Sequence, residues 1–350
     1  MSDVAEIEII IDGETIESNY FQVEHLKVDL SSEIASLFSL TITNVINNQL
    51  ELVTPWVFKM GTRIKIRAGY PSDLEDLMDG IITSVTYHYA DEEHLTIEVE
   101  GCDLLFLLMK QYRQRSFSEM SDSEVVTEVL RDYGLESDIE DSEILYNHIQ
   151  QDHESDFSFV SRLAKRNGFE FYNRGETIYF KSPAVESSPS EVFTFGVDPI
   201  TVNCRHDITH LFERVHTHGW DRLNKEPVEE ESNIVDVSSV ESQWQYPSAS
   251  ISRLGLSDIV YSLSENYENS QSAQREADAM MQKFAYTLVK VKGSLRGLAT
   301  LTPATVIELN GFSQVHNGKY YLTHVIHRIG ENQGFTTHFE MRGDRIHESL

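Results

Sequence analysis

Between Cys204 and His218 the chain places four histidines and one cysteine within fifteen positions, and these side chains can all bind metal ions. The histidines are His206, His210, His216 and His218. A His-x-His pair puts both rings on one face of a β-strand. The sequence has no second compact ligand pair and no His-Glu-x-x-His helix beside it. We therefore interpret these histidines as packed or solvated strand residues and expect no metal or cofactor. A metal-dependent hydrolase built on this segment is the weaker alternative.

Two other groups of side chains could support acid-base chemistry or metal binding. Glu154 and Asp156 are two carboxylates close in sequence, as glycosidases use. They stand at the start of an expected helix, where acidic groups complement the helix dipole and cap free N–H groups, and we prefer this role. His324 and His327 are three apart in an expected strand, so they face opposite sides and cannot readily share a metal ion. No Gly-x-Ser-x-Gly elbow or Walker sequence occurs, so the sequence predicts no enzyme.

The net charge is strongly acidic, at −29 with 28 basic and 57 acidic residues. Such a chain cannot hold nucleic acid by neutralising phosphates. An acidic wall would let DNA pass without adhering, although acidity also serves plain solubility.

Length and apolar content set further limits. A chain of 350 residues with 40% hydrophobic residues exceeds what one core normally supports, so we expect several domains. Its two cysteines, Cys102 and Cys204, are expected to be buried free thiols. No apolar run is long enough to span a membrane, and residues 1–6 do not have the form of a secretory signal.

The first hundred residues alternate apolar and polar positions, which is typical of β-strands. Asp12 and Gly13 predict a tight hairpin turn, since this pair favours positive φ angles. Further strands are expected at residues 25–30, 38–43, 63–70, 81–89 and 95–99.

Helical patterns begin after residue 103. Ser121 and Glu124 form a capping-box pattern before one helix, and Gly134 follows its end. A second helix is expected over residues 155–166, with Phe157 and Leu163 on its apolar face and Gly168 as its stop.

The last part of the chain returns to strands. A strand is expected at 209–218, an acidic serine-rich loop at 227–250, and a helix at 271–286. The β-helix-β order is consistent with two similar β units. We therefore predict a mainly β chain with three parts: a first β unit at 1–103, an α/β insertion at 104–185 and a second β unit at 186–350.

Four passages carry a resemblance to a known family, at residues 80–103, 113–135, 151–172 and 272–342. Together they resemble the baseplate hub proteins of contractile tails, the phage late control protein D family. The most specific passage is similar to a helix shared with the VgrG spike proteins of type VI secretion. Its motif residues are Glu154, Ser155, Asp156, Phe157, Leu163 and Gly168. His327 fits the family's C-terminal pattern, which implies a structural hydrogen-bonding role for it.

The resemblance implies two tube-like β-barrels and a homotrimer of pseudo-sixfold symmetry. Such a hub joins a tail tube protein or tube initiator above to a spike below, contacts baseplate wedge proteins, and forms part of a channel that DNA crosses without specific binding. It would be assembled in the host cytoplasm and reside in the virion baseplate. Because the chain stops at Leu350, we expect the spike to be a separate polypeptide. The alternative is the hub of an extracellular contractile injection system or a gene-transfer particle.

Overall fold

The computed structural model describes most of the chain. The described residues are 4–16, 22–43, 58–71, 73–89, 95–221, 224–233, 244–245, 247–256, 258–267, 269–330 and 334–347.

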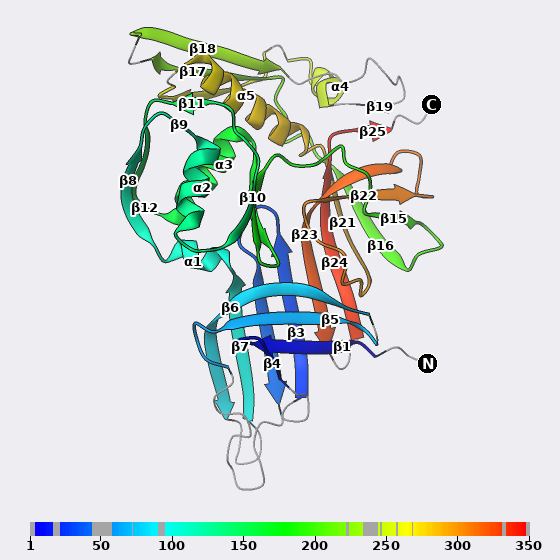
Figure 1. Ribbon diagram of the computed structural model, residues 1–350. Coiled ribbons are helices and arrows are strands. Elements are labelled where there is room, and N and C mark those ends of the chain that lie inside the picture. Colours follow the sequence, from blue (N-terminus) through cyan, green and yellow to red (C-terminus); the bar gives the residue numbers. More distant parts are fainter. Residues whose placement is uncertain are drawn as a thin grey trace.

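The protein is mainly β, as the alternating sequence predicts (Figure 1). The strands of the first part are β1 (Glu6–Ile11), β2 (Glu14–Thr15), β3 (Gln22–Ser31), β4 (Leu37–Thr43), β5 (Arg63–Tyr70), β6 (Asp73–Tyr89) and β7 (Leu95–Asp103). Those of the middle part are β8 (Tyr112–Phe117), β9 (Met120–Ser121), β10 (Glu136–Ile139), β11 (Leu145–Tyr146), β12 (Ile149–Ser155), β13 (Glu170–Arg174) and β14 (Thr177–Lys181). The remaining strands are β15 (Glu191–Thr194), β16 (Ile200–His206), β17 (Arg214–Asp221), β18 (Glu226–Asn233), β19 (Trp244–Gln245), β20 (Val260–Glu265), β21 (Val289–Arg296), β22 (Thr305–Asn310), β23 (Gly318–Gly330), β24 (Gly334–Gly343) and β25 (Ile346–His347).

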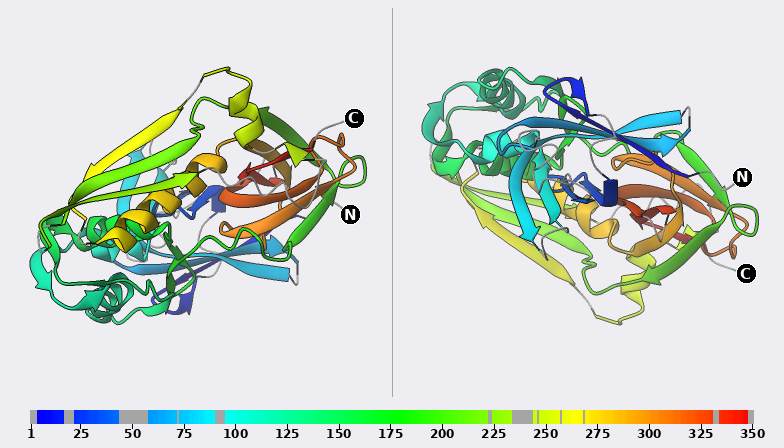
Figure 2. Two further views of the ribbon diagram at one scale, coloured as in Figure 1. Left: turned by 90° about the horizontal axis from the view of Figure 1, so that it is seen from above. Right: turned by 90° about the horizontal axis from the view of Figure 1, so that it is seen from below.

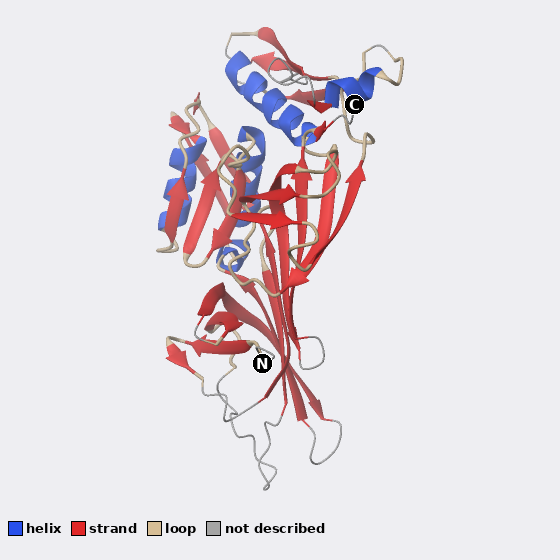
Figure 3. Ribbon diagram, turned by 90° about the vertical axis from the view of Figure 1, so that its right-hand side faces the viewer, coloured by secondary structure: helices blue, strands red, loops and turns tan. Residues whose placement is uncertain are grey.

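Helices are few and lie outside the large sheet (Figure 3). They are α1 (Leu105–Met109), α2 (Asp122–Arg131), α3 (Asp156–Asn167), α4 (Pro247–Ser252) and α5 (Ser270–Ala285). No helix in the described ranges is both long enough and apolar enough to cross a membrane.

One 13-stranded sheet connects the two β units. Strands β1–β7 form the first sheet unit, and β15, β16 and β21–β24 form the second. The two units join where β23 pairs antiparallel with β3, from His324 opposite Ser31 to Gly330 opposite His25. One hydrophobic core runs through both units. In the described residues the two predicted barrels are therefore parts of one continuous sheet.

The expected hairpin at the start of the chain is confirmed. Asp12 and Gly13 have φ angles of 51° and 85° and connect β1 to β2. Two positive φ angles in succession give a turn whose twist matches that of paired strands.

The insertion, residues 104–185, contains α1–α3 and β8–β14 around a core of its own. The cap predicted for α2 is present, and α3 is capped by a serine. Ser121 and Glu124 form a reciprocal capping box on α2, and Ser155 accepts a hydrogen bond from the Ser158 backbone N–H on α3. Gly168 ends α3 with φ 70°, a conformation that costs glycine little.

Strands β17, β18 and β20 form a smaller sheet that is covered by α5 (Figure 2). Val215, Thr217 and Val228 are buried on its inner side, and so are Ala273 and Ala277 of the helix. The predicted helix at 271–286 is confirmed with bounds shifted by one residue.

Two expectations about this region are wrong. The strand expected at 209–218 begins only at Arg214, because Asp207 accepts the Thr209 backbone N–H at 2.9 Å and holds a turn there. The loop expected at 227–250 begins as strand β18, since Val228 and Ser232 alternate with exposed residues and turn toward α5. Residues 234–243 of that loop lie outside the described residues.

Candidate assembly site

The junction of the two sheet units carries charged pairs as well as backbone pairing. His324 Nε2 on β23 lies 2.5 Å from Asp29 Oδ1 on β3, and Lys27 Nζ lies 2.6 Å from Asp29 Oδ2. The bond to Asp29 raises the pKa of His324. Arg342, on the neighbouring strand β24, donates from Nη1 to Glu33 Oε1 at 2.6 Å. The junction therefore specifies its register through side chains as well as the backbone.

His327 lies on the opposite face of β23 and is 1% exposed. One ring nitrogen, Nδ1, is 3.1 Å from Thr337 Oγ1, and the other, Nε2, is 3.1 Å from the Leu301 carbonyl oxygen. Burial lowers the pKa of His327 to about 4. The ring thus forms part of the core of the second sheet unit as a neutral, hydrogen-bonded group.

We expect His327 to make the fold sensitive to acid. The unfolded imidazole titrates near 6.5 and the folded one near 4, so between these values the unfolded chain binds more protons and acidification favours unfolding. Its contribution is complete above pH 6.5 and lost by pH 4, with a slope of at most ~1.4 kcal/mol per pH unit. Urea unfolding of the wild type and of His327→Gln across this window measures the difference in slope. Parallel pH profiles would contradict the assignment.

The Glu-Ser-Asp motif of α3 organises a buried polar cluster. Asp156, whose side chain is fully buried, accepts hydrogen bonds from Arg115 Nη2 at 2.6 Å, Gln151 Nε2 at 2.7 Å and Tyr133 Oη at 2.5 Å. Glu154 instead pairs with Arg162 at 2.6 Å on the surface. The predicted capping role therefore falls to the hydroxyl of Ser155, while Asp156 ties α3 to β8, β12 and the end of α2.

A second cluster of this kind was missed from the sequence. Asp122, also fully buried at the start of α2, accepts hydrogen bonds from Arg166 Nε and Asn167 Nδ2, each at 2.6 Å. Both aspartates follow a capping serine, at Ser121 and Ser155. That shared Ser-Asp pair is the signal in the sequence that could have revealed both clusters.

The apolar face of α3 differs in one respect from the expected one. Leu163 and Phe159 are fully buried, whereas Phe157 is only half-buried against Phe171 at a ring distance of 5.8 Å. Phe159 stacks on Phe117 and is the aromatic anchor that the sequence interpretation overlooked.

Gly168 is required for a reason beyond its φ angle. A Cβ atom there would lie 2.9 Å from the Cβ of Ala279 on α5. The glycine therefore lets the end of α3 approach α5 closely, and the insertion contacts the helix of the second β unit.

Glu170 links the insertion to both sheet units. Its carboxylate accepts a hydrogen bond of 2.7 Å from the hydroxyl of Ser32, the residue that follows β3. It accepts a second one, of 2.5 Å, from the hydroxyl of Tyr321 on β23. Burial raises the pKa of Glu170 to about 7, against the effect of these two donors. The carboxyl group thus bridges three parts of the molecule.

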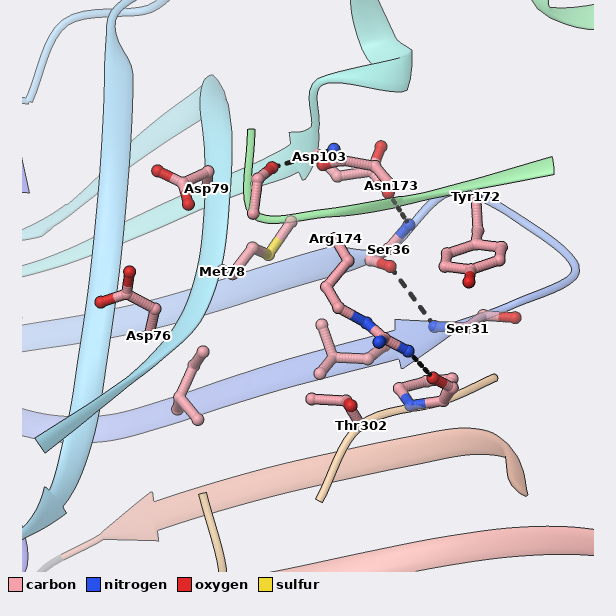
Figure 4. Close-up of a pocket in the computed structure, with 14 residues that line it drawn as sticks. Ser31, Ser36, Asp76, Met78, Asp79, Asp103, Tyr172, Asn173, Arg174 and Thr302 are labelled. Atoms are coloured by element: carbon pink, nitrogen blue, oxygen red, sulfur yellow. Dashed lines mark hydrogen bonds between the residues drawn. The ribbon is translucent and has the colours of Figure 1, made fainter. Parts of the chain in front are cut away.

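A small cavity beside this bridge shows the same convergence (Figure 4). Arg174, the last residue of β13, donates to the carbonyl oxygen of Pro303 just before β22. Asp103, at the end of β7, accepts the Ser36 backbone N–H at 2.6 Å, and burial raises the pKa of Asp103 to about 7. Residues of the insertion and of both sheet units therefore line the cavity together.

The histidines singled out from the sequence are dispersed. His206 lies on β16 beside His316, with ring centroids 5.2 Å apart, while His216 and His218 lie 5.7 Å apart on β17 of the smaller sheet. His210 stands in the turn before β17. Within the described part of the chain, no three His, Cys, Asp or Glu side chains gather as a metal site would require.

The cysteines are separate free thiols. Cys102 is buried at the end of β7, and burial raises its pKa to about 12. Cys204 is half-buried on β16, and burial raises its pKa as well. Neither environment favours a nucleophilic thiolate.

The fold of this chain, a continuous two-unit sheet with an α/β insertion, is shared with solved phage tail proteins. The 43 kDa tail protein of prophage MuSo2 from Shewanella oneidensis matches with a TM-score of 0.70 at 13% identity, covering 96% of this chain and 98% of that one. A type VI secretion component of E. coli, described as similar to the T4 tail proteins gp27 and gp5, matches with a TM-score of 0.60 at 13% identity, covering 97% of this chain and 77% of that one.

Sequence comparison agrees with the fold. The probable baseplate hub protein of Escherichia phage 186 is 24% identical over 285 residues, which cover 73% of this chain and 72% of that protein. The family model described as the Alg8 N-terminal domain matches residues 1–331, and the chain belongs to this family. The resemblance to baseplate hub proteins read from the sequence is confirmed.

Proposed function

We propose that this protein is a non-enzymatic baseplate hub of a contractile phage tail and a component of the virion. The continuous sheet of two units is the observation that carries the proposal, because it presents one extended β surface from a single chain. The relative from phage 186 and the shared fold support it. The buried groups of the junction have structural partners, which suits a scaffold.

In this proposal the chain forms a homotrimer with first and second tube-like units at 1–103 and 186–350 and the insertion at 104–185. Six sheet units from three chains would adapt a sixfold tail tube to a threefold spike. The motif residues of α3 and His327 would hold the units in fixed relation rather than contact a ligand. The charge of −29 would keep passing DNA from adhering to the wall.

The mass of the purified chain in solution tests the trimer. We expect light scattering to give three times the 40.1 kDa of one chain at high protein concentration. Measurement at low and moderate salt controls for charge repulsion between copies. A strict monomer at every concentration would contradict the trimer.

A further inference from the structure

The order of strands in the first sheet unit recurs in the second. The first unit runs β3-β4-β7-β6-β5, and the second runs β16-β21-β24-β23-β22 (Figure 1). The outermost strands differ in direction, because β1 pairs antiparallel with β5 whereas β15 pairs parallel with β22. In each unit the longest strand, β6 or β23, pairs on one side with the next strand along the chain. On its other side, the first part of that strand pairs with the preceding strand, β5 or β22. The strand order indicates an internal duplication.

The register of pairing supports the same correspondence. A bulge interrupts the β6–β7 pairing at Thr83 and the β23–β24 pairing at Thr323. Thr83 Oγ1 donates to the Glu100 carbonyl oxygen at 3.3 Å, and Thr323 Oγ1 donates to the Glu340 carbonyl oxygen at the same distance. Both the threonines and the glutamates are 240 positions apart. Residues 78–89 of β6 and all residues of β7 thus have counterparts in β23 and β24, 240 positions later.

Strands β3 and β16 correspond through the same ladder. The directly opposed residues are Val28, Phe38 and Gly101 in the first unit, and Cys204, Val291 and Met341 in the second. Since Met341 lies 240 positions after Gly101, Cys204 is the counterpart of Val28.

The duplication leaves one pairing without its counterpart. Within the chain, β3 pairs with the second part of β23, where Val28 lies opposite His327. By the same correspondence, the counterpart of β3 is β16, which would pair through its outer edge. The counterpart of the second part of β23 is the second part of β6, residues 84–89. Among the described strands, β16 pairs only with β21, and this part of β6 pairs only with β7.

The exposure of side chains marks both edges as uncovered. Tyr87 and Tyr89 on β6 are 42% and 69% exposed, whereas their counterparts His327 and Ile329 are 1% and 8% exposed. On β16, Cys204 is half-buried, while its counterpart on β3 is fully buried. Open strand edges with large apolar side chains are uncommon in proteins that remain monomeric.

We propose that β16 of one copy pairs antiparallel with residues 84–89 of β6 in the next copy, repeating between chains the β3–β23 junction found within each chain. The register of that junction places Tyr87 opposite Cys204 and Tyr89 opposite Val202. This inference rests on the proposed trimer and names its interface. It makes the junctions within and between chains alike, so that three chains close a ring of six units without a free edge.

The substitution Tyr87→Cys tests the pairing, because the expected partner, Cys204, is a native free thiol. Directly opposed antiparallel residues have Cα atoms about 4.5 to 5.5 Å apart, within the range that a disulfide spans. We expect mild oxidation to convert most of the variant into dimers and trimers on a non-reducing gel, reversed by reductant. Tyr87→Cys with Cys204→Ser should give no such bands, because the other thiol, Cys102, is buried.

The substitution His88→Cys is the register control, since a shift of one residue turns the new thiol to the other face of the strand. It should cross-link at least tenfold more slowly than Tyr87→Cys. Faster cross-linking of His88→Cys would overturn the register. Bands that persist without Cys204 would show that some other contact forms them and would also overturn the pairing.

Light scattering on the same samples separates this inference from the proposed function. A trimer that does not cross-link at Tyr87→Cys would overturn the β16–β6 pairing and leave the hub assignment intact. A chain that stays monomeric and uncross-linked at high concentration would overturn the trimer and its interface together. A wild-type-like circular dichroism spectrum ensures that each variant is folded.

Discussion

Leu163→Asp is expected to unfold the insertion. Leu163 is fully buried in the core of the insertion, so an aspartate there would be an unpaired buried charge. We expect a loss of at least about 4 kcal/mol in the free energy of unfolding of this unit. Near-ultraviolet circular dichroism and limited proteolysis of the full chain measure the loss.

The same helix supplies controls for this prediction. Lys165→Asp introduces the same side chain at an exposed position and should cost about 1 kcal/mol or less. Phe157→Asp should fall between the two, because Phe157 is half-buried. Wild-type melting of the double variant Phe157→Asp with Leu163→Asp would show that this face of α3 does not pack into the core.

Asp156→Ala is expected to have the second largest effect. It removes the buried carboxylate that holds Arg115, Gln151 and Tyr133, and leaves an arginine without its inner partner. Breaking a buried pair in this way typically costs about 3 to 5 kcal/mol. Urea unfolding followed by tryptophan fluorescence and circular dichroism gives the change.

Asp132 is a matched control because it bonds the same group of arginines from the surface. Its carboxylate lies 2.5 Å from Arg113 Nη1 and 3.4 Å from Arg115 Nη1 and is 39% exposed. Asp132→Ala should therefore change stability by about 1 kcal/mol or less. Equal effects of the two substitutions would refute a special role for the buried carboxylate.

The helices of the insertion could be predicted closely because their signals are local. Ser121 with Glu124 fixes the start of α2, and Ser155 and Gly168 fix the start and the end of α3, each through backbone groups only a few residues away. The hairpin at Asp12 and Gly13 is equally local. These elements depend on backbone geometry that the nearest side chains determine.

The junction and the polar clusters could not be predicted in the same way. The partners of Asp156 come from β8, β12 and the end of α2, and no spacing in the sequence brings them together. The pairing of β3 with β23 joins segments hundreds of residues apart. Acidic composition also concealed β18, whose inward positions Val228 and Ser232 become informative only once α5 covers them.

The β3–β23 junction sets an order of events during protein synthesis. Asp29 and His324 are 295 positions apart, so β3 leaves the ribosome long before its partner strand exists. At about 5 to 20 residues per second, this interval is roughly 15 to 60 s. During that time the edge of β3, with Leu26 and Val28, must remain uncovered. A nascent or truncated chain therefore lacks the completed sheet, and the hydrophobic core shared by the two units closes only after β23 has been made.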